Sequence, residues 1–341
     1  MTDNVLEVEN LFVTYGYGDS TVVACDDVSL CVERNSIIGI VGESGSGKST
    51  LLNAIARLQR PPAGIAGGKV LLHSARFGSH DLASMEEERI RALRWTSFSF
   101  VFQSAMDALN PVMRMEAQFY DLLKTHDRKT TKLQARETAG ELFRMVGIAE
   151  DRLRAYPYEM SGGMRQRAAI ALAMACTPDI IFMDEPTTAV DVVMQRQILG
   201  NLLELKQTLK FAIVFVTHDM SLLLEFADKI AVMYAGKVVE VGTSHDLYAH
   251  PKHPYSEMLR DSFPPLHGEL RHLEGIPGSP PNLKAIPAGC PFEPRCPHRM
   301  DICAQQKPPL VDVGGTEVAC WLHPGPRPRA AAPRESIEGA A

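Results

Sequence analysis

The chain has 341 residues, of which 45% are apolar and 22% charged, and its formal net charge is −6. This is the composition of an ordinary globular protein, long enough for two domains. The negative charge argues against a nucleic-acid binder, because neutralising phosphates requires a basic surface. No apolar run approaches the roughly 20 residues that span a bilayer, and the N-terminus has no secretory signal. We therefore expect any membrane role to be peripheral.

The first part of the chain predicts strands followed by one helix. Apolar and polar residues partly alternate at 6–15 and 28–32, as they do in half-buried strands. The apolar run 37–41 predicts a fully buried strand of a parallel sheet. A glycine-rich turn follows, then a helix over about 48–58, and a further strand at 98–102.

That glycine-rich turn, Gly42-Glu-Ser-Gly-Ser-Gly-Lys-Ser49, matches GxxxxGK[ST] between a strand and a helix, as the motif requires. Its glycines let backbone N–H groups point at phosphate oxygens, and the helix N-terminus adds a favourable dipole. Lys48 supplies a positive charge to the β- and γ-phosphates, and the Ser49 hydroxyl is a Mg²⁺ ligand. A turn without a ligand is the weaker alternative. The motif alone leaves kinases, GTPases and helicases open. The predicted nucleotide contacts are Gly42, Ser44, Gly45, Ser46, Gly47, Lys48, Ser49 and Thr50.

Helical patterns dominate the middle of the chain, at 112–147 and 161–176, and predict a helical subdomain over about 104–172. Ser161 is a good N-cap for the second helix, and the two glycines after it allow a close backbone approach. A helix start with free N–H groups is an anion site. In isolation, a simple capped helix explains this pattern better.

The apolar run 180–183 predicts a buried strand that ends in Asp184 and Glu185. Ligands bind at the carboxyl ends of strands in open α/β sheets. Asp184 is suited to hold Mg²⁺, and Glu185 to polarise an attacking water. A solvated acidic pair would be the preferred reading without the phosphate loop upstream. Further strands are expected at 212–217, 229–234 and 237–241.

These motifs together resemble the ABC ATPase family. The resemblance rests on the phosphate loop, Gln103, Ser161-Gly-Gly-Met-Arg-Gln, Ile-Ile-Phe-Met-Asp184-Glu185-Pro, Asp191 and His218, in that order. It covers roughly 5–245, and P-loop kinases and GTPases lack the Ser-Gly-Gly signature. The resemblance implies an α/β fold: a P-loop NTPase core over 1–245 with an antiparallel β flank and a helical subdomain. It also implies ATP hydrolysis with Mg²⁺.

The resemblance also implies a role for each matching residue. Tyr15 stacks on adenine. Gln103 senses the γ-phosphate and Mg²⁺ and links to the permease, while His218 contacts the γ-phosphate. The implied catalytic residues are Glu185, His218 and Gln103, and the implied Mg²⁺ ligands are Ser49, Gln103 and Asp184.

Members of this family work as head-to-tail dimers, so the resemblance implies a site shared between two subunits. Asp191 belongs to the loop that crosses the dimer interface. Ser161 and Gly163, with Gly162 between them, then contact ATP that is held by the opposite subunit.

Composition shifts after about residue 246 towards Pro, His, Gly and Cys, which predicts a small loop-rich domain over 246–324 and a disordered tail over 325–341. His250-Pro-Lys-His-Pro-Tyr255, Ile276-Pro-Gly-Ser-Pro-Pro and Cys290-Pro-Phe-Glu-Pro-Arg-Cys296-Pro resemble the oligopeptide/dipeptide group of ABC import ATPases. This implies the motor of a peptide importer. Nickel and oligosaccharide importers share the extension and stay open. An export motor or a soluble ABC ATPase of translation or DNA repair is a weaker alternative.

Four of the seven cysteines gather in this last domain: Cys290, Cys296, Cys303 and Cys320. Their clustering suits one metal centre, and their spacing is not the CxxC pair of zinc ribbons. Four thiolates suit a [4Fe–4S] cluster, which some relatives with this extension carry. Zn²⁺ or no metal remains the alternative.

The resemblance finally implies partners. They are two membrane permease subunits, a second ABC ATPase subunit that is identical or a paralogue, and an extracytoplasmic substrate-binding protein, with no nucleic acid. We expect the chain to lie peripherally on the cytoplasmic face of the membrane.

Overall fold

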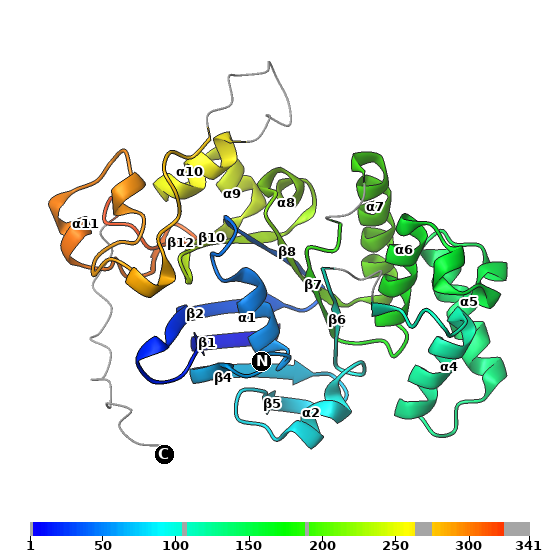
Figure 1. Ribbon diagram of the computed structural model, residues 1–341. Helices are drawn as coiled ribbons and strands as arrows, with labels where there is room; N and C mark the ends of the chain where they lie inside the picture. The colour runs from blue at the N-terminus through cyan, green and yellow to red at the C-terminus, as the bar shows by residue number, and fades with distance from the viewer. Residues whose placement is uncertain (1–2, 104–107, 188–190, 263–274, 324–341) are drawn as a thin grey trace.

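The structure, a computed structural model, describes residues 3–103, 108–187, 191–262 and 275–323. The predicted disordered tail at 325–341 lies outside these residues. Within the described ranges, no helix has the length and apolar character needed to cross a membrane. Two β-sheets form the centre of the molecule, and helices lie between and around them (Figure 1).

An antiparallel sheet, in the order β2-β1-β4-β5, forms the N-terminal flank that the resemblance implies. The half-buried strands predicted at 6–15 and 28–32 are present, and the second begins earlier than predicted. The alternation did not predict β4, because Gly64, Gly67 and Gly68 interrupt it, yet this strand pairs with β1 along most of its length. The strands are β1 (Asn4–Tyr15), β2 (Val22–Glu33), β4 (Ala63–Ser74) and β5 (Gly78–Asp81).

The main sheet has the order β11-β12-β10-β9-β3-β8-β7-β6. The strands from β9 to β6 are parallel neighbours, whereas β10, β12 and β11 continue the sheet antiparallel. Every residue of β3, β7 and β8 is buried, as their continuous apolar runs predict. The strands are β3 (Ile37–Val41), β6 (Phe98–Val101), β7 (Ile180–Asp184), β8 (Ala212–Thr217), β9 (Lys229–Tyr234), β10 (Lys237–Thr243), β11 (Val311–Val313) and β12 (Thr316–Val318).

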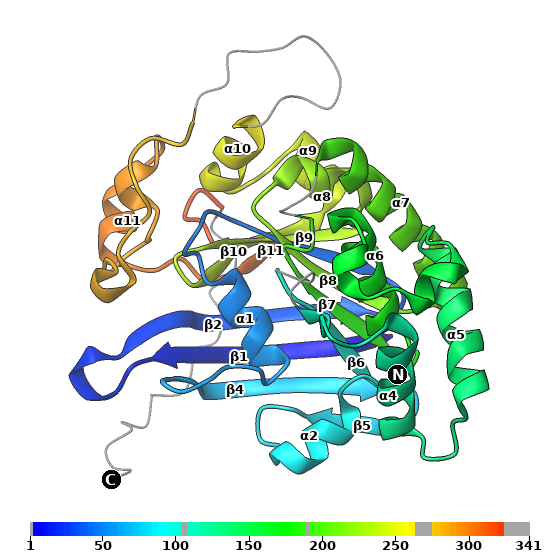
Figure 2. The ribbon, with the colours of Figure 1, turned by 45° about the vertical axis from the view of Figure 1, so that its right-hand side comes forward.

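The helices divide into a central one and an outer set. Helix α1 lies between the two sheets (Figure 2), and its Leu51, Leu52 and Ile55 belong to a core built from both. Helices α4 to α6 gather at one end of the molecule, where the helical pattern is predicted. The helices are α1 (Lys48–Ile55), α2 (Glu87–Leu93), α4 (Met115–His126), α5 (Lys132–Met145), α6 (Gly162–Ala173), α7 (Val192–Leu209), α8 (Met220–Phe226), α9 (Ser244–Ala249), α10 (Pro254–Asp261) and α11 (Asp301–Gln305).

The C-terminal region is attached to the main sheet, because β12 pairs with β10. The Pro- and Gly-rich composition did not predict these short strands. Since β3, β7 and β8 are parallel neighbours, the segments that leave their carboxyl ends lie together. Those segments carry the phosphate loop, the Asp184-Glu185 pair and His218.

Candidate active site

The phosphate loop, Gly42–Ser49, joins β3 to α1, and two glycines in it cannot be replaced without distortion. Gly47 has φ of 101°, a left-handed conformation that glycine adopts without strain. A Cβ on Gly42 would lie 2.1 Å from the Met233 carbonyl oxygen. Helix α1 begins directly after Gly47 with no side-chain cap. Its first N–H groups are therefore available to an anion.

Lys48 folds back over this loop. Its Nζ donates to the carbonyl oxygens of Gly42 at 2.7 Å and Glu43 at 3.0 Å. Burial lowers the pKa of Lys48, and the carboxylates of Glu185, Asp184 and Glu43 work in the opposite direction. The loop thus holds the buried Lys48 amine at its centre, close to acidic side chains. The negative charge of a bound polyphosphate would neutralise this amine.

Ser49 and Asp184, both predicted as Mg²⁺ ligands, contact each other. The Ser49 hydroxyl donates to Asp184 Oδ1 at 2.9 Å. Burial raises the pKa of Asp184, and the Glu185 carboxylate adds to this, whereas the Ser49 bond and Lys48 oppose it. Two oxygen donors from different elements fit Mg²⁺, which binds proteins through one or two carboxylates and keeps its remaining positions for water and phosphate.

Glu185 brings together the ends of three strands. Its Oε2 accepts a hydrogen bond from Gln103 Nε2 at 3.0 Å, and its Oε1 lies 3.3 Å from His218 Nδ1. Its φ of 43° is left-handed, which costs a non-glycine residue energy and persists where the surroundings enforce it. Here its N–H donates to the Val216 carbonyl at 2.9 Å. The structure therefore joins the three predicted catalytic residues around one carboxylate.

Tyr15 lies at the edge of this site. Its hydroxyl is 3.5 Å from the Thr50 hydroxyl on α1, and 39% of its surface is exposed. The ring to which the resemblance gives adenine stacking thus lies exposed beside the helix that follows the phosphate loop.

A second group of predicted residues lies elsewhere. Ser161 caps α6 and Asp191 caps α7 through side-chain hydrogen bonds. The two helix starts are neighbours, since a Cβ on Gly163 would lie 2.9 Å from Met194 Sδ. Strands β7 and β8 stand between α1 and α6 in both views (Figures 1 and 2). One chain does not bring Ser161, Gly162 and Gly163 to its own phosphate loop.

Sequence reasoning missed three residues of this site: Glu43, Tyr255 and Arg295. The Glu43 N–H donates to the Tyr255 hydroxyl at 2.9 Å. The Arg295 guanidinium donates to both Glu43 carboxylate oxygens, at 2.6 and 3.0 Å. Glu43 lay within the predicted phosphate loop, and Tyr255 and Arg295 within motifs of the C-terminal extension, but no local pattern indicated that these residues contact one another.

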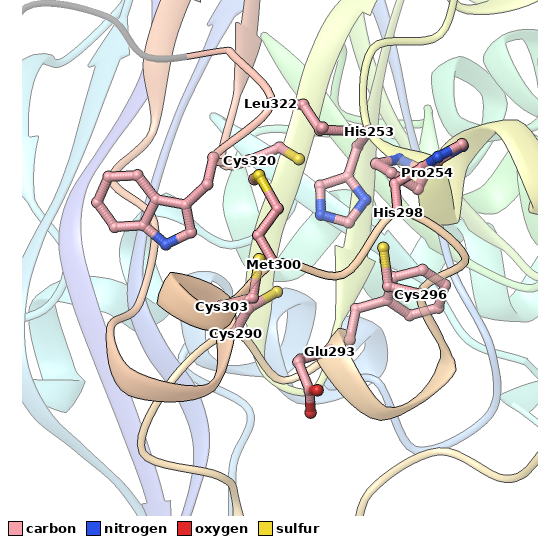
Figure 3. Close-up of a pocket in the computed structure, with 12 residues that line it drawn as sticks. His253, Pro254, Cys290, Glu293, Cys296, His298, Met300, Cys303, Cys320 and Leu322 are labelled. Carbon is pink, nitrogen blue, oxygen red and sulfur yellow. The ribbon is translucent and has the colours of Figure 1, made fainter.

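The four clustered cysteines line one pocket (Figure 3), together with His253, Phe292 and neighbouring loop residues. Burial raises the pKa of Cys290 and of Cys320 to about 11 each. In the part of the chain that the structure describes, no set of three or more His, Cys, Asp or Glu side chains is arranged to hold a metal ion. The pocket confirms that the thiols share one place but does not confirm the predicted iron–sulfur centre.

Comparison with known families gives two matches along the chain. Residues 25–188 match the model described as ABC transporter. Residues 239–303 match the model described as oligopeptide/dipeptide transporter, C-terminal region. The first contains the phosphate loop and the Asp184-Glu185 pair, and the second contains three of the four pocket cysteines.

Individual proteins agree with these matches. The chain is 39% identical to a dipeptide transport ATP-binding protein of Caldanaerobacter subterraneus, over 95% of this chain and 98% of that one. It is 40% identical to an oligopeptide transport ATP-binding protein of Escherichia coli, over 94% and 93% of the two chains. A solved dimeric ATP-binding cassette in a post-hydrolysis state, bound to ADP and phosphate, superposes with a TM-score of 0.61 at 28% identity, covering 70% of this chain and 98% of that chain.

Proposed function

Because this chain belongs to the ABC transporter family of ATPases, we propose that it is the motor subunit that drives the import of dipeptides or oligopeptides. One observation favours peptides over nickel and oligosaccharides as the cargo. Similarity to peptide-transport ATP-binding proteins runs through more than 90% of both chains and includes the C-terminal region. The C-terminal region alone would leave nickel and oligosaccharide importers open, whereas these full-length relatives are named for dipeptide and oligopeptide transport.

In this proposal, the phosphate loop and Lys48 bind the β- and γ-phosphates of ATP. The Ser49 hydroxyl and the Asp184 carboxylate, 2.9 Å apart, hold Mg²⁺, with Gln103 nearby as a further ligand. Glu185 polarises the attacking water, and its contacts with Gln103 and His218 orient its carboxylate. Catalysis then consists mainly of positioning and charge neutralisation around the γ-phosphate.

We further propose that two motor subunits complete each other's sites. Helix α6, whose start carries Ser161, Gly162 and Gly163, is separated by β7 and β8 from α1, which follows the phosphate loop. A head-to-tail second subunit, identical or a paralogue, would bring this helix start to the γ-phosphate, with Asp191 at the interface. The pair binds two permease subunits at the cytoplasmic face of the membrane and receives its cargo through an extracytoplasmic binding protein.

The pocket of four cysteines is the proposed site of a [4Fe–4S] cluster. The donor chemistry fits, because four thiols line one pocket whose walls include Phe292, Met300 and Trp321. When bound, the cluster would supply metal–thiolate bonds that tie together a region of short loops. Because burial raises the pKa of Cys290 and of Cys320, their thiolates would form only beside a cation such as the irons of the cluster. Anaerobically purified protein should absorb broadly near roughly 400 nm and contain about four irons per chain. Protein that contains stoichiometric zinc would show a Zn²⁺ site in place of the cluster. Protein without metal, whose four thiols are freely alkylated, would contradict any metal site in this pocket.

The peptide-import proposal is tested in the assembled transporter. The motor is reconstituted in proteoliposomes with its permease and binding protein, and uptake of labelled peptides is compared with uptake of Ni²⁺ and of an oligosaccharide. We expect ATP-dependent accumulation of peptide that stops when Glu185 is replaced by Gln. Uptake of Ni²⁺ or sugar without peptide would leave the ATPase assignment intact and overturn the peptide cargo.

A further inference from the structure

Arg295 connects the C-terminal region to the phosphate loop by a paired contact. Its two terminal nitrogens donate to the two carboxylate oxygens of Glu43, at 2.6 and 3.0 Å. The arginine side chain is 5% exposed and the glutamate side chain 24%. A bidentate pair of this kind fixes orientation as well as distance, and shelter from water strengthens it.

The guanidinium is itself held from several sides. Its Nε donates to the Pro277 carbonyl at 2.7 Å, and a terminal nitrogen donates to the Tyr234 hydroxyl at 3.2 Å. Its Cζ also lies 5.8 Å from the centre of the Tyr234 ring. Arg295 is therefore fixed independently of Glu43, so it acts as an anchor to which the loop is attached.

The attached residue is one that supports Lys48. The Glu43 N–H donates to the fully buried Tyr255 hydroxyl at 2.9 Å, and the Glu43 carbonyl accepts from Lys48 Nζ at 3.0 Å. The C-terminal region thus contacts both the side chain and the backbone amide of Glu43, while the Glu43 carbonyl accepts a hydrogen bond from the Lys48 amine.

We propose that Arg295 is a positioning residue for ATP binding. By pairing with Glu43, it fixes the turn that presents Lys48 and keeps an acidic side chain engaged away from the phosphates. Without the arginine, an unpaired carboxylate would stand in a loop that receives a polyanion, and like charges at close range repel. The proposal rests on the ATPase activity and is independent of the cargo.

The cysteine pocket adjoins this contact. Arg295 directly precedes Cys296, and Phe292, which lines the pocket, packs with its ring centre 5.3 Å from that of Tyr234 and 5.4 Å from that of Tyr255. The segment that forms one wall of the pocket therefore also supplies the anchor of the phosphate loop.

The test uses full-length chain in the assembled transporter, with ATP binding measured directly by equilibrium titration and hydrolysis measured as KM and kcat. In Arg295→Met, we expect the Kd and KM for MgATP to rise about tenfold with kcat within about twofold, because truncating one partner leaves the other charge unpaired. The double variant Arg295→Met/Glu43→Gln should recover at least about threefold of the lost affinity, since no unpaired carboxylate remains. Arg295→Lys should lie between wild type and Arg295→Met.

The matched control is Arg299→Met in the same region, whose side chain is 67% exposed and 4.0 Å from Glu293. It should leave Kd, KM and kcat unchanged. An Arg295→Met protein that folds and binds MgATP like wild type would overturn the proposal, as would a double variant no better than the single one. If Arg295→Met does not fold, Arg295→Lys keeps the positive charge but loses the bidentate contact with Glu43, and an unchanged Kd and KM for MgATP in that variant would overturn the proposal equally. Loss of peptide uptake alone, with ATP binding as expected, would concern the cargo instead.

Discussion

The phosphate loop and the cysteine pocket organise their ligating groups in opposite ways. In the phosphate loop, Lys48 already donates to backbone carbonyls and Ser49 to Asp184, so the polar groups that face a nucleotide are held by the protein itself. In the pocket, the thiols share a lining but form no set arranged around a metal, within the residues described. A contiguous motif on a strand–helix turn orders its own site, whereas ligands scattered over loops depend on what they bind.

The prediction with the largest expected effect changes the phosphate-loop site and leaves the cysteine pocket unchanged. Glu185→Gln keeps the shape of the side chain and removes the carboxylate that Gln103 and His218 contact. ATP hydrolysis by the assembled transporter should fall by about 100-fold or more, while ATP binding and the metal content of the pocket stay unchanged. Measuring all three on one preparation checks the prediction.

Glu225→Gln is the matched control, because Glu225 lies on α8 and pairs with Arg196 on the surface. Its hydrolysis rate should equal that of wild type. Near wild-type turnover by Glu185→Gln would remove Glu185 from its proposed role.

The second prediction changes the cysteine pocket and leaves the phosphate-loop site unchanged. Cys296→Ser should lower the metal content and the melting temperature by several degrees, given roughly 2–4 °C for each kcal/mol lost. Turnover at saturating ATP should persist, since β3 and β7 hold Lys48 and Glu185. Iron analysis, thermal unfolding and ATPase assays are the measurements. Cys31→Ser, at an exposed position on β2, should change none of them. A Cys296→Ser protein with full metal content would contradict the proposed ligand set.

The same contrast explains which features could be predicted from the sequence and which could not. Residues within a motif or at the end of an apolar run were placed correctly: Lys48, Asp184, Glu185 and His218 meet at the carboxyl ends of parallel strands. Strand β4 was missed because its glycines hide the alternation that its pairing with β1 enforces. The contact between Glu43 and Arg295 joins the two ends of the chain, so no local pattern contains it.

A third, smaller effect tests whether Asp184, the proposed Mg²⁺ ligand, opposes folding in the absence of metal. Burial raises the pKa of Asp184, so the folded state binds its proton more tightly than the unfolded state does. Folding is favoured below the unfolded pKa, and that contribution is lost as pH rises through the folded pKa. Asp184→Asn should therefore raise the melting temperature of the nucleotide-free protein at pH 7 by about 1–2 °C, with no gain below about pH 4.

Asp26→Asn provides the opposite case. Burial disfavours ionisation of Asp26 too, but ion pairs with Lys307 at 2.9 Å and Lys237 at 3.2 Å outweigh it and lower its pKa. Its contribution to stability is present above the unfolded pKa and is lost as pH falls through the folded pKa. At pH 7, Asp26→Asn should lower the melting temperature. Shifts of the same sign in both variants would mean that packing, not ionisation, controls these two sites.

The smallest effect concerns the Tyr255 hydroxyl, through which the C-terminal region contacts the backbone of the phosphate loop. Tyr255→Phe removes the acceptor of the Glu43 N–H and leaves the buried ring in place. A single hydrogen bond contributes about 0.5–1.5 kcal/mol, so the KM for ATP should rise between about twofold and about twelvefold with kcat unchanged. Tyr248→Phe on α9, where the side chain is partly exposed, serves as the control. If Tyr255→Phe lowers the melting temperature but not the affinity for ATP, the C-terminal region supports the fold without positioning the loop through its backbone. If Tyr255→Phe lowers the affinity for ATP but not the melting temperature, the C-terminal region affects ATP binding through Glu43. The phenylalanine ring would still pack as the tyrosine ring does, so a loss of packing could not explain weaker ATP binding.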